Sequence, residues 1–139
     1  MSGYVRQTPA SLESVEQTSL FRWAAFHTGK WPELRLMHAI PNGGMRHKAT
    51  AARLKEEGVK AGVPDICLPV PRGVYHGLYI ELKRLRGSRV SDEQEKWLAD
   101  LTAQGYRAVV CKGWLAASEE IARYMSLPEG ERCVIGDLI

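Results

Sequence analysis

The stretch that decides the fold is GVPDICLPVPRGVYHGLYIELK, residues 62–83. It holds two apolar, β-prone runs, Asp65–Val70 and Gly77–Lys83, and Pro71-Arg72-Gly73 lies between them. Proline and glycine in a short connection favour a tight turn. We therefore expect the two runs to be antiparallel neighbours in a sheet.

Charged residues stand at the ends of both runs. Asp65 opens the first run, and the second alternates so that Tyr79, Glu81 and Lys83 share one face of a strand. A charge on a largely buried strand needs a metal, a partner or water to offset its loss of hydration. This need indicates that two acids and one lysine converge on a site, although a turn aspartate and an exposed Glu81–Lys83 ion pair are the plain alternative.

The rest of the chain alternates between helical and strand patterns. Helices are expected over 11–28, 47–58, 91–105 and 114–125, and strands over 33–40 and 106–111. In the third helix Ser91 and Gln94 have capping-box spacing, and Gly105 ends the pattern. The order of elements predicts an α/β fold with a central mixed β-sheet flanked by α-helices.

Length and composition fit a single domain. The chain has 139 residues, of which 45% are hydrophobic and 25% charged. We expect a lead-in over 1–10, a domain over 11–125 and a tail over 126–139 that is docked or lies at a dimer interface. No apolar stretch approaches the roughly 20 residues of a membrane helix, and the N-terminus lacks an apolar signal core, so we expect a cytoplasmic protein without a membrane partner.

We expect most of the cysteines and tryptophans of this chain to lie in the core. Three widely spaced cysteines, Cys67, Cys111 and Cys133, suit reduced core thiols better than disulfides or a zinc site. Tryptophans 23, 97 and 114 recur at core spacing, so we assign them to packing, and Trp31 is undecided.

Basic residues form two segments around the acids, while the net charge is only +3. The first segment spans 46–60 and the second 83–89. For either run alone a solvated charged face is the better explanation, but the position of the two runs around two carboxylates favours phosphate binding. The candidate nucleic-acid contacts are Asn42, Arg46, His47, Lys48, Arg53, Lys60, Arg84, Arg86 and Arg89.

The acids and the lysine suit metal-assisted phosphodiester chemistry. Magnesium prefers oxygen ligands and is usually held by one or two carboxylates together with substrate phosphate. Asp65 and Glu81 supply such a pair, and the backbone carbonyl of Leu82 between the site residues could join them. Lys83 projects from the same face as Glu81 and could orient a water and neutralise charge on the phosphate.

A further acid lies upstream. Glu16 falls one turn from Leu20 and two from Trp23 on the first predicted helix, which turns it toward the buried side, whereas Glu13 is nearer the rim. A solvated boundary position explains Glu16 equally well.

Several motifs together resemble one family. Pro64-Asp65 followed by Glu81-Leu82-Lys83 looks like the PD-(D/E)XK nuclease signature. Further matching motifs are Glu16-Gln17, His38–Gly44, Lys60–Asp65, Gly77–Lys83, Ser91–Trp97 and Gly105-Tyr106. The set, from about Ser14 to Trp114, is similar to the virus-type replication-repair nuclease (VRR-Nuc) family in its stand-alone phage and prophage form.

The resemblance implies a restriction-endonuclease-like fold and cleavage of DNA that depends on Mg²⁺, with Mn²⁺ able to substitute. By position, Asp65 and Glu81 match metal ligands, Lys83 the catalytic lysine and Gln94 the glutamine of the following helix. Glu16, or alternatively Glu13, matches the helix acid that supplements the metal site. Gln94 is also explained by its capping role alone. Asn42 matches a turn near the site where backbone approaches phosphate.

The function implied is an endonuclease acting on structured DNA and leaving 5′-phosphate and 3′-hydroxyl ends. Stand-alone members resemble Holliday-junction resolvases and act as homodimers, which gives two active sites about a two-fold axis. We expect branched DNA as partner, a homodimer and no nucleotide cofactor. The alternatives are a flap, nick or single-strand nuclease, and an inactive nucleic-acid-binding module.

Overall fold

The computed structural model describes residues 9–41 and 48–129. In chain order the elements are α1 (Pro9–Phe26), the 3₁₀ helix η1 (Pro32–Leu36), β1 (His38–Ala39), α2 (Lys48–Glu56), β2 (Ile66–Leu68), β3 (Leu78–Lys83), α3 (Asp92–Ala103), β4 (Arg107–Lys112) and α4 (Gly113–Met125).

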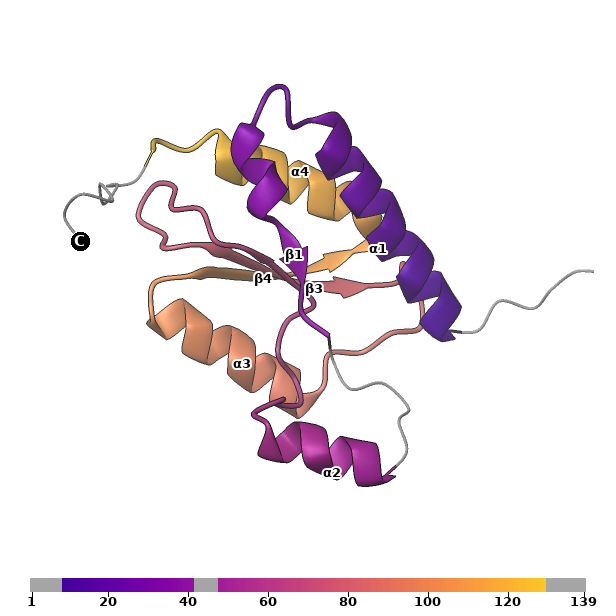
Figure 1. Ribbon diagram of the computed structural model, residues 1–139. Helices are drawn as coiled ribbons and strands as arrows, with labels where there is room; N and C mark the ends of the chain where they lie inside the picture. The colour runs from indigo at the N-terminus through magenta and orange to yellow at the C-terminus, as the bar shows by residue number, and fades with distance from the viewer. Residues whose placement is uncertain (1–8, 42–47, 130–139) are drawn as a thin grey trace, which may run out of the picture.

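The strands form one mixed sheet in the order β1-β2-β3-β4 (Figure 1). β2 is antiparallel to β1 and to β3, as the turn between the two apolar runs predicts. β4 is parallel to β3 and pairs with it from Leu78 opposite Arg107 to Lys83 opposite Lys112. The carboxyl ends of β3 and β4 therefore lie side by side at one end of the sheet.

Helices cover both faces of the sheet. α1 and α4 pack together on one face and α3 lies on the other (Figure 1). Buried Ile80 and Leu82 of β3 join Leu20 of α1 and Ile121 of α4 in one apolar cluster. Glu81, between them in sequence, points to the opposite face, toward α3. The alternation along β3 thus separates the hydrophobic core from a polar site, and the expected sheet with flanking helices is confirmed.

The segment 33–40 differs from its prediction. It begins as the 3₁₀ helix η1, and only His38–Ala39 forms a strand. Pro32 at the start fixes a helical φ. Leu34 and Met37 are buried three residues apart, the repeat of a 3₁₀ turn, whereas Leu36, which a strand would place on the same face as Leu34, is 44% exposed.

The strand predicted over 106–111 forms as β4, but it is less buried than expected. It is an edge strand of the sheet, and Cys111 is its only buried residue. Cys67 and Cys111 are both free and buried, as predicted, and Cys133 lies outside the described residues.

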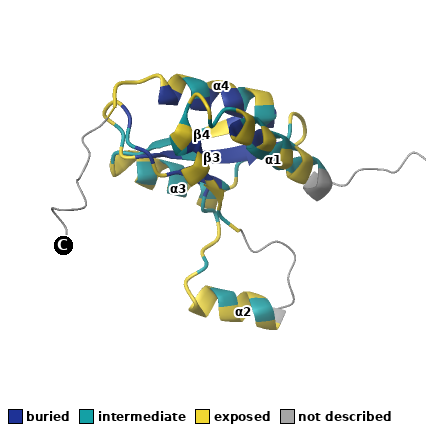
Figure 2. Cartoon of the chain, turned by 45° about the horizontal axis from the view of Figure 1, so that its top comes forward, coloured by how far each residue is buried: buried dark blue, intermediate teal, exposed yellow. Residues whose placement is uncertain are grey.

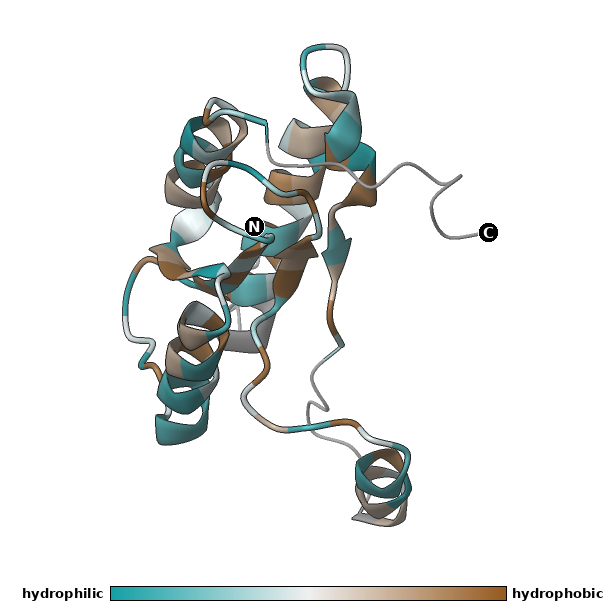
Figure 3. Ribbon diagram, turned by 90° about the vertical axis from the view of Figure 1, so that its left-hand side faces the viewer, coloured by the Kyte–Doolittle hydropathy of each residue, from teal (hydrophilic) through white to brown (hydrophobic). Residues whose placement is uncertain are grey.

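α2 stands away from the sheet and its layers (Figures 2 and 3). Most of its side chains after Lys48 are exposed, and Gly58, with φ of 100°, ends the helical turn that follows it. Residues 42–47, which precede α2, lie outside the described part of the chain. Across residues 9–41 and 48–129 we find no helix whose length and apolarity would let it cross a membrane.

Candidate metal and phosphodiester site

Asp65 and Glu81 face each other across the β2–β3 ladder. Ile66 pairs with Ile80, so one step further along the antiparallel ladder Asp65 stands opposite Glu81. The Asp65 carboxylate accepts a hydrogen bond from the Leu82 backbone N–H at 2.8 Å. This bond fixes Asp65 at the point where β2 begins.

The loop before Asp65 is anchored on α3. Trp97 of α3 donates from its indole nitrogen to the Ala61 carbonyl at 3.0 Å. Gly62 has φ of 87°, and a Cβ there would come within 2.7 Å of the Glu93 backbone. Only glycine allows this approach without strain. Trp97, which was predicted to pack in the core, instead anchors this loop by a hydrogen bond, and α3 positions both acids of the site.

Glu81 is the buried centre of the site, with 2% of its surface exposed. Its Oε1 accepts a hydrogen bond from Gln94 Nε2 at 2.8 Å and lies 3.4 Å from Lys83 Nζ. Its Oε2 is buried and has no hydrogen-bond donor among the described residues.

The environment of Glu81 favours its protonated form. Burial raises its pKa, the negative charge and a hydrogen bond of Asp65 raise it further, and Lys83 lowers it, with a result of about 8. A protonated Glu81 would therefore donate a hydrogen bond to the Asp65 carboxylate. A cation bound between the two carboxylates would offset their repulsion in place of that proton.

These atoms fit a hard divalent cation. Two carboxylates meet, one buried oxygen has no donor, and magnesium prefers such oxygen ligands. The N–H and C=O of one residue point to the same side of a strand, so the Leu82 carbonyl points to the side where Asp65 lies. Among the described residues, Asp65, Glu81 and the Leu82 carbonyl could hold such a cation.

Lys83 is buried beside Glu81 and not at the surface. It is 8% exposed, so the Glu81–Lys83 pair differs from a solvated strand ion pair. A buried pair at a strand end is costly to assemble and provides a fixed positive charge next to the acids.

Gln94 both completes a capping box and contacts Glu81. Its backbone N–H donates to Ser91 Oγ at 3.2 Å and its Oε1 accepts from the Ser91 N–H at 2.9 Å, which completes the capping box. Its Nε2 is then directed at Glu81. The cap fixes which end of the amide faces the site.

Glu16 lies near the same end of the sheet but apart from the two acids. Its Oε2 accepts a hydrogen bond from the Trp114 backbone N–H at 2.6 Å. The N-cap residue of α4, Lys112, makes no side-chain cap, so Glu16 satisfies this helix end from α1. Within residues 9–41 and 48–129, no group of three or more His, Cys, Asp or Glu side chains is close enough to hold a metal.

Lys112 is a residue that the sequence analysis missed. The β3–β4 register sets it beside Lys83, so both side chains lie on the face of Glu81, and Lys112 is exposed. The sequence contains the residue but not the parallel register, and the predicted strand stopped one residue short of it.

The predicted phosphate-binding residues differ in whether their side chains are free to contact DNA. Arg53 is exposed 3.9 Å from Glu57, and Lys60, Arg86 and Arg89 are exposed. Arg84 instead donates from Nε to the Arg86 carbonyl at 2.7 Å and so stabilises the turn that follows β3. Lys48 begins α2. Asn42, Arg46 and His47 lie outside the described residues.

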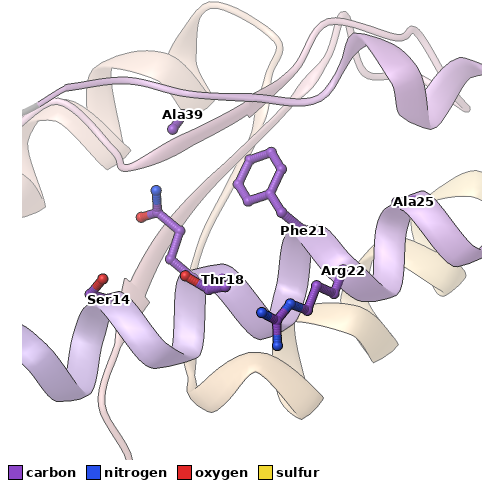
Figure 4. Close-up of a pocket in the computed structure, with 7 residues that line it drawn as sticks. Ser14, Thr18, Phe21, Arg22, Ala25 and Ala39 are labelled. Carbon is purple, nitrogen blue, oxygen red and sulfur yellow. The ribbon is translucent and has the colours of Figure 1, made fainter.

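One hollow on the described surface is separate from these acids. It measures about 740 Å³ and lies between α1 and β1, where Phe21 points from α1 toward Ala39 (Figure 4). Neither the acids nor Lys83 line it. The candidate chemistry therefore belongs to the strand ends and not to this groove.

Comparisons with known proteins identify the family and agree with the fold. The family model described as VRR-NUC domain matches residues 13–114. A solved structure described as "VRR_NUC domain protein" is 31% identical, with a TM-score of 0.75 over 91% of this chain and 96% of that chain. No curated protein matches. The chain belongs to the VRR-NUC domain family, a family of nucleases.

Proposed function

We propose that this protein is a metal-dependent DNA endonuclease whose site is Asp65, Glu81 and Lys83. The observation that carries the proposal is the buried Glu81 Oε2, which has no donor among the described residues while Asp65 stands opposite. A purely structural site has no reason to keep this oxygen opposite a second acid, because burial and the like charge of Asp65 then force Glu81 to hold a proton.

Asp65, Glu81 and the Leu82 carbonyl would hold Mg²⁺, or Mn²⁺ in its place. The ion would polarise the phosphate and lower the pKa of a bound water. Gln94 orients Glu81, and Glu16 would supplement the site from α1. Because Glu16 already accepts from the Trp114 N–H, its contribution would come from the remaining lone pairs of its carboxylate.

Lys83 would hold the attacking water and face the charge that develops on the phosphate. The water oxygen attacks phosphorus, the bond from phosphorus to the 3′ oxygen breaks, and that oxygen takes up a proton. The products are a 5′-phosphate and a 3′-hydroxyl. Glu81 Oε1, 3.4 Å from Nζ, holds the Lys83 side chain at this position.

The substrate proposed is branched DNA, with a Holliday junction as the leading form, and the active unit proposed is a homodimer. Symmetric cleavage of a junction needs two sites about a two-fold axis. Basic residues on α2 and on the turn after β3 would contact phosphates, with Lys112 beside Lys83 as a further contact. We place the nuclease domain at residues 11–125.

The test compares substrates and variants together. Wild type, Lys83→Ala and Lys96→Ala are incubated with four-way junctions, flaps and plain duplex, in Mg²⁺ and in chelator. Lys96 is an exposed lysine of α3 without a proposed role. We expect paired symmetric nicks on the junction by wild type and Lys96→Ala, and none by Lys83→Ala or in chelator.

Other results would redirect the proposal. Equal cleavage by Lys83→Ala would contradict the assigned site. Preferred cleavage of flaps would change the substrate, and salt-sensitive binding without any cleavage would favour the binding module. A light-scattering mass that corresponds to a monomer at assay concentration would contradict the dimeric resolvase.

A further inference from the structure

We propose that an aromatic groove at the end of α1 binds an unpaired nucleotide where branched DNA carries a single-stranded arm. The inference rests on the proposed nuclease function and adds a second contact for one form of its branched substrate. The groove measures about 320 Å³, and the residues that line it are Ser19, Arg22, Trp23, Phe26, His27 and Trp114.

Aromatic side chains in the groove and beside it form an ordered array. The rings of Trp23 and His27 are stacked with centroids 4.4 Å apart, and Trp31 follows 6.4 Å from His27. His27 Nδ1 donates to the Trp23 carbonyl at 2.7 Å, which holds the imidazole in this stack. Trp23 and Trp114 pack against the core on one side, so the groove is lined by rings in fixed positions.

The exposure of the Phe26 side chain is not explained by packing within the fold. It is 91% exposed at the last residue of α1, beside this array. An isolated exposed phenylalanine is unremarkable, but here it lines a groove with two tryptophans. Aromatic side chains around a groove are the arrangement on which unpaired bases stack, since every base offers a flat π face.

The charge of the groove favours an anion. Arg22 is exposed at its edge, and Lys30 Nζ lies 4.6 Å above the ring of Trp31 at the end of the array. None of the six lining residues is acidic. Flat rings together with arginine and lysine match a base with its phosphate.

The same charge argues against a second copy of the chain. A two-fold contact centred on this groove would bring Arg22 of one copy toward Arg22 of the other. No acid in the lining would offset that repulsion.

The position of the groove connects it to the proposed active site. Trp114 follows Lys112 by two residues, and its N–H is held by Glu16. From Glu16 to Phe26 α1 rises by about 15 Å, at about 1.5 Å per residue. A strand that leaves the site along α1 would reach the groove within a few nucleotides.

The experiment measures binding in chelator, where no cleavage is needed. Two DNAs are compared, a duplex with a single-stranded arm and the same duplex without it, and 2-aminopurine is placed at successive positions of the arm. The variants are Phe26→Ala, Phe26→Trp and the control Val74→Ala, which removes another exposed apolar side chain, 86% exposed, in the turn after β2.

We expect quenching of 2-aminopurine at a few adjacent arm positions. Phe26→Ala should weaken binding of the armed DNA between about five- and one hundred-fold and lose the quenching, because stacking is removed. Binding of the unarmed duplex should be unchanged. Phe26→Trp should restore both signals, and Val74→Ala should match wild type.

The inference is overturned if Phe26→Ala binds armed DNA as wild type does, or weakens both DNAs equally. It is also overturned if Phe26→Ala converts a dimer to a monomer by light scattering, since a second copy would then cover the groove. Cleavage in Mg²⁺ is scored separately: an arm-specific effect of Phe26 without cleavage would reject the nuclease proposal and leave this one standing.

Discussion

Gln94 donates a hydrogen bond to Glu81 over 2.8 Å while the other end of its amide caps α3 through Ser91. One side chain thus links the start of a helix to the buried acid of the site. Stability and activity should therefore both depend on Gln94, and they can be separated.

Ser91→Ala removes the cap but leaves the Gln94 side chain in place. We expect it to lower the free energy of unfolding by about 1 kcal/mol and to keep most of the activity. Gln94→Ala should cost a similar amount of stability and lower kcat at least about tenfold, because Glu81 loses its orienting donor. Denaturant unfolding and nicking assays check this pair. Equal loss of activity in both variants would mean that the cap, and not the contact with Glu81, is what matters.

The metal-free protein should lose stability as pH rises. The pKa of Glu81 is raised to about 8 in the folded state from 4.5, so the folded protein holds a proton that the unfolded chain releases between these values. The stabilisation is complete below about pH 4.5 and is lost as pH rises through about 8.

Thermal unfolding in chelator from acid to alkaline pH measures this effect. Glu81→Gln should remove most of the pH dependence across that window. Mg²⁺ should stabilise wild type more at alkaline than at acid pH, because the ion competes with the proton. A wild-type melting temperature that does not fall across this window would argue against the shifted pKa.

Lys112 should contribute to DNA binding without taking part in chemistry. Its side chain is exposed and lies on the face of Lys83. Lys112→Ala should raise KM, leave kcat unchanged and reduce the slope of log binding constant against log salt by about 0.9. The matched control Lys96→Ala should change neither. A fall in kcat alone would instead assign Lys112 to the reacting centre.

Glu16→Gln should separate the two roles of the helix acid. Glutamine can still accept from the Trp114 N–H, so we expect the unfolding free energy to change by less than about 1 kcal/mol. The charge that would supplement the metal is lost, so Mn²⁺ affinity should fall several-fold. Calorimetric titration of Mn²⁺ checks the second point, and unchanged affinity would leave Glu16 with its capping role only.

A salt-bridge network at the other end of the sheet should affect stability alone. Glu120 is held 2.8 Å from both Arg107 and Arg123. Burial raises the pKa of Glu120, but the hydrogen bonds and charges of the two arginines outweigh burial and lower it below its usual value. Its contribution is therefore present above about pH 4.5 and is lost as pH falls through the lower folded value.

Glu120→Gln should lower the free energy of unfolding at neutral pH by about 1–3 kcal/mol. The difference from wild type should shrink in acid, and kcat should stay unchanged. Urea unfolding at neutral and acid pH checks this, and an equal deficit at both would argue against a charge-dependent contribution.

Local patterns in the sequence predicted much of the fold and of the site. The turn at Pro71-Arg72-Gly73, the alternation from Tyr79 to Lys83 and the Ser91–Gln94 spacing are each encoded within a few residues. The β2–β3 pair and the capping box were predicted for this reason.

What the sequence could not predict depends on contacts between distant segments. The parallel β3–β4 register brings Lys112 to Lys83, and the Glu16–Trp114 bond joins residues 98 positions apart. The 3₁₀ helix at Pro32–Leu36 arose because Pro32 and the burial of Leu34 outweighed a β-like pattern. Phe26 was missed because an exposed aromatic residue cannot be told from a buried one by spacing.

The central claim is that Asp65 and Glu81 hold a divalent metal, and Mn²⁺ anomalous scattering from crystals of wild type and Glu81→Gln tests it most directly. We predict one or more anomalous peaks within ligand distance of Glu81 Oε2 and Asp65 in wild type, and their loss in Glu81→Gln. Crystals soaked in Mn²⁺ that carry no peak at these oxygens, or a peak that persists in Glu81→Gln, would contradict the account.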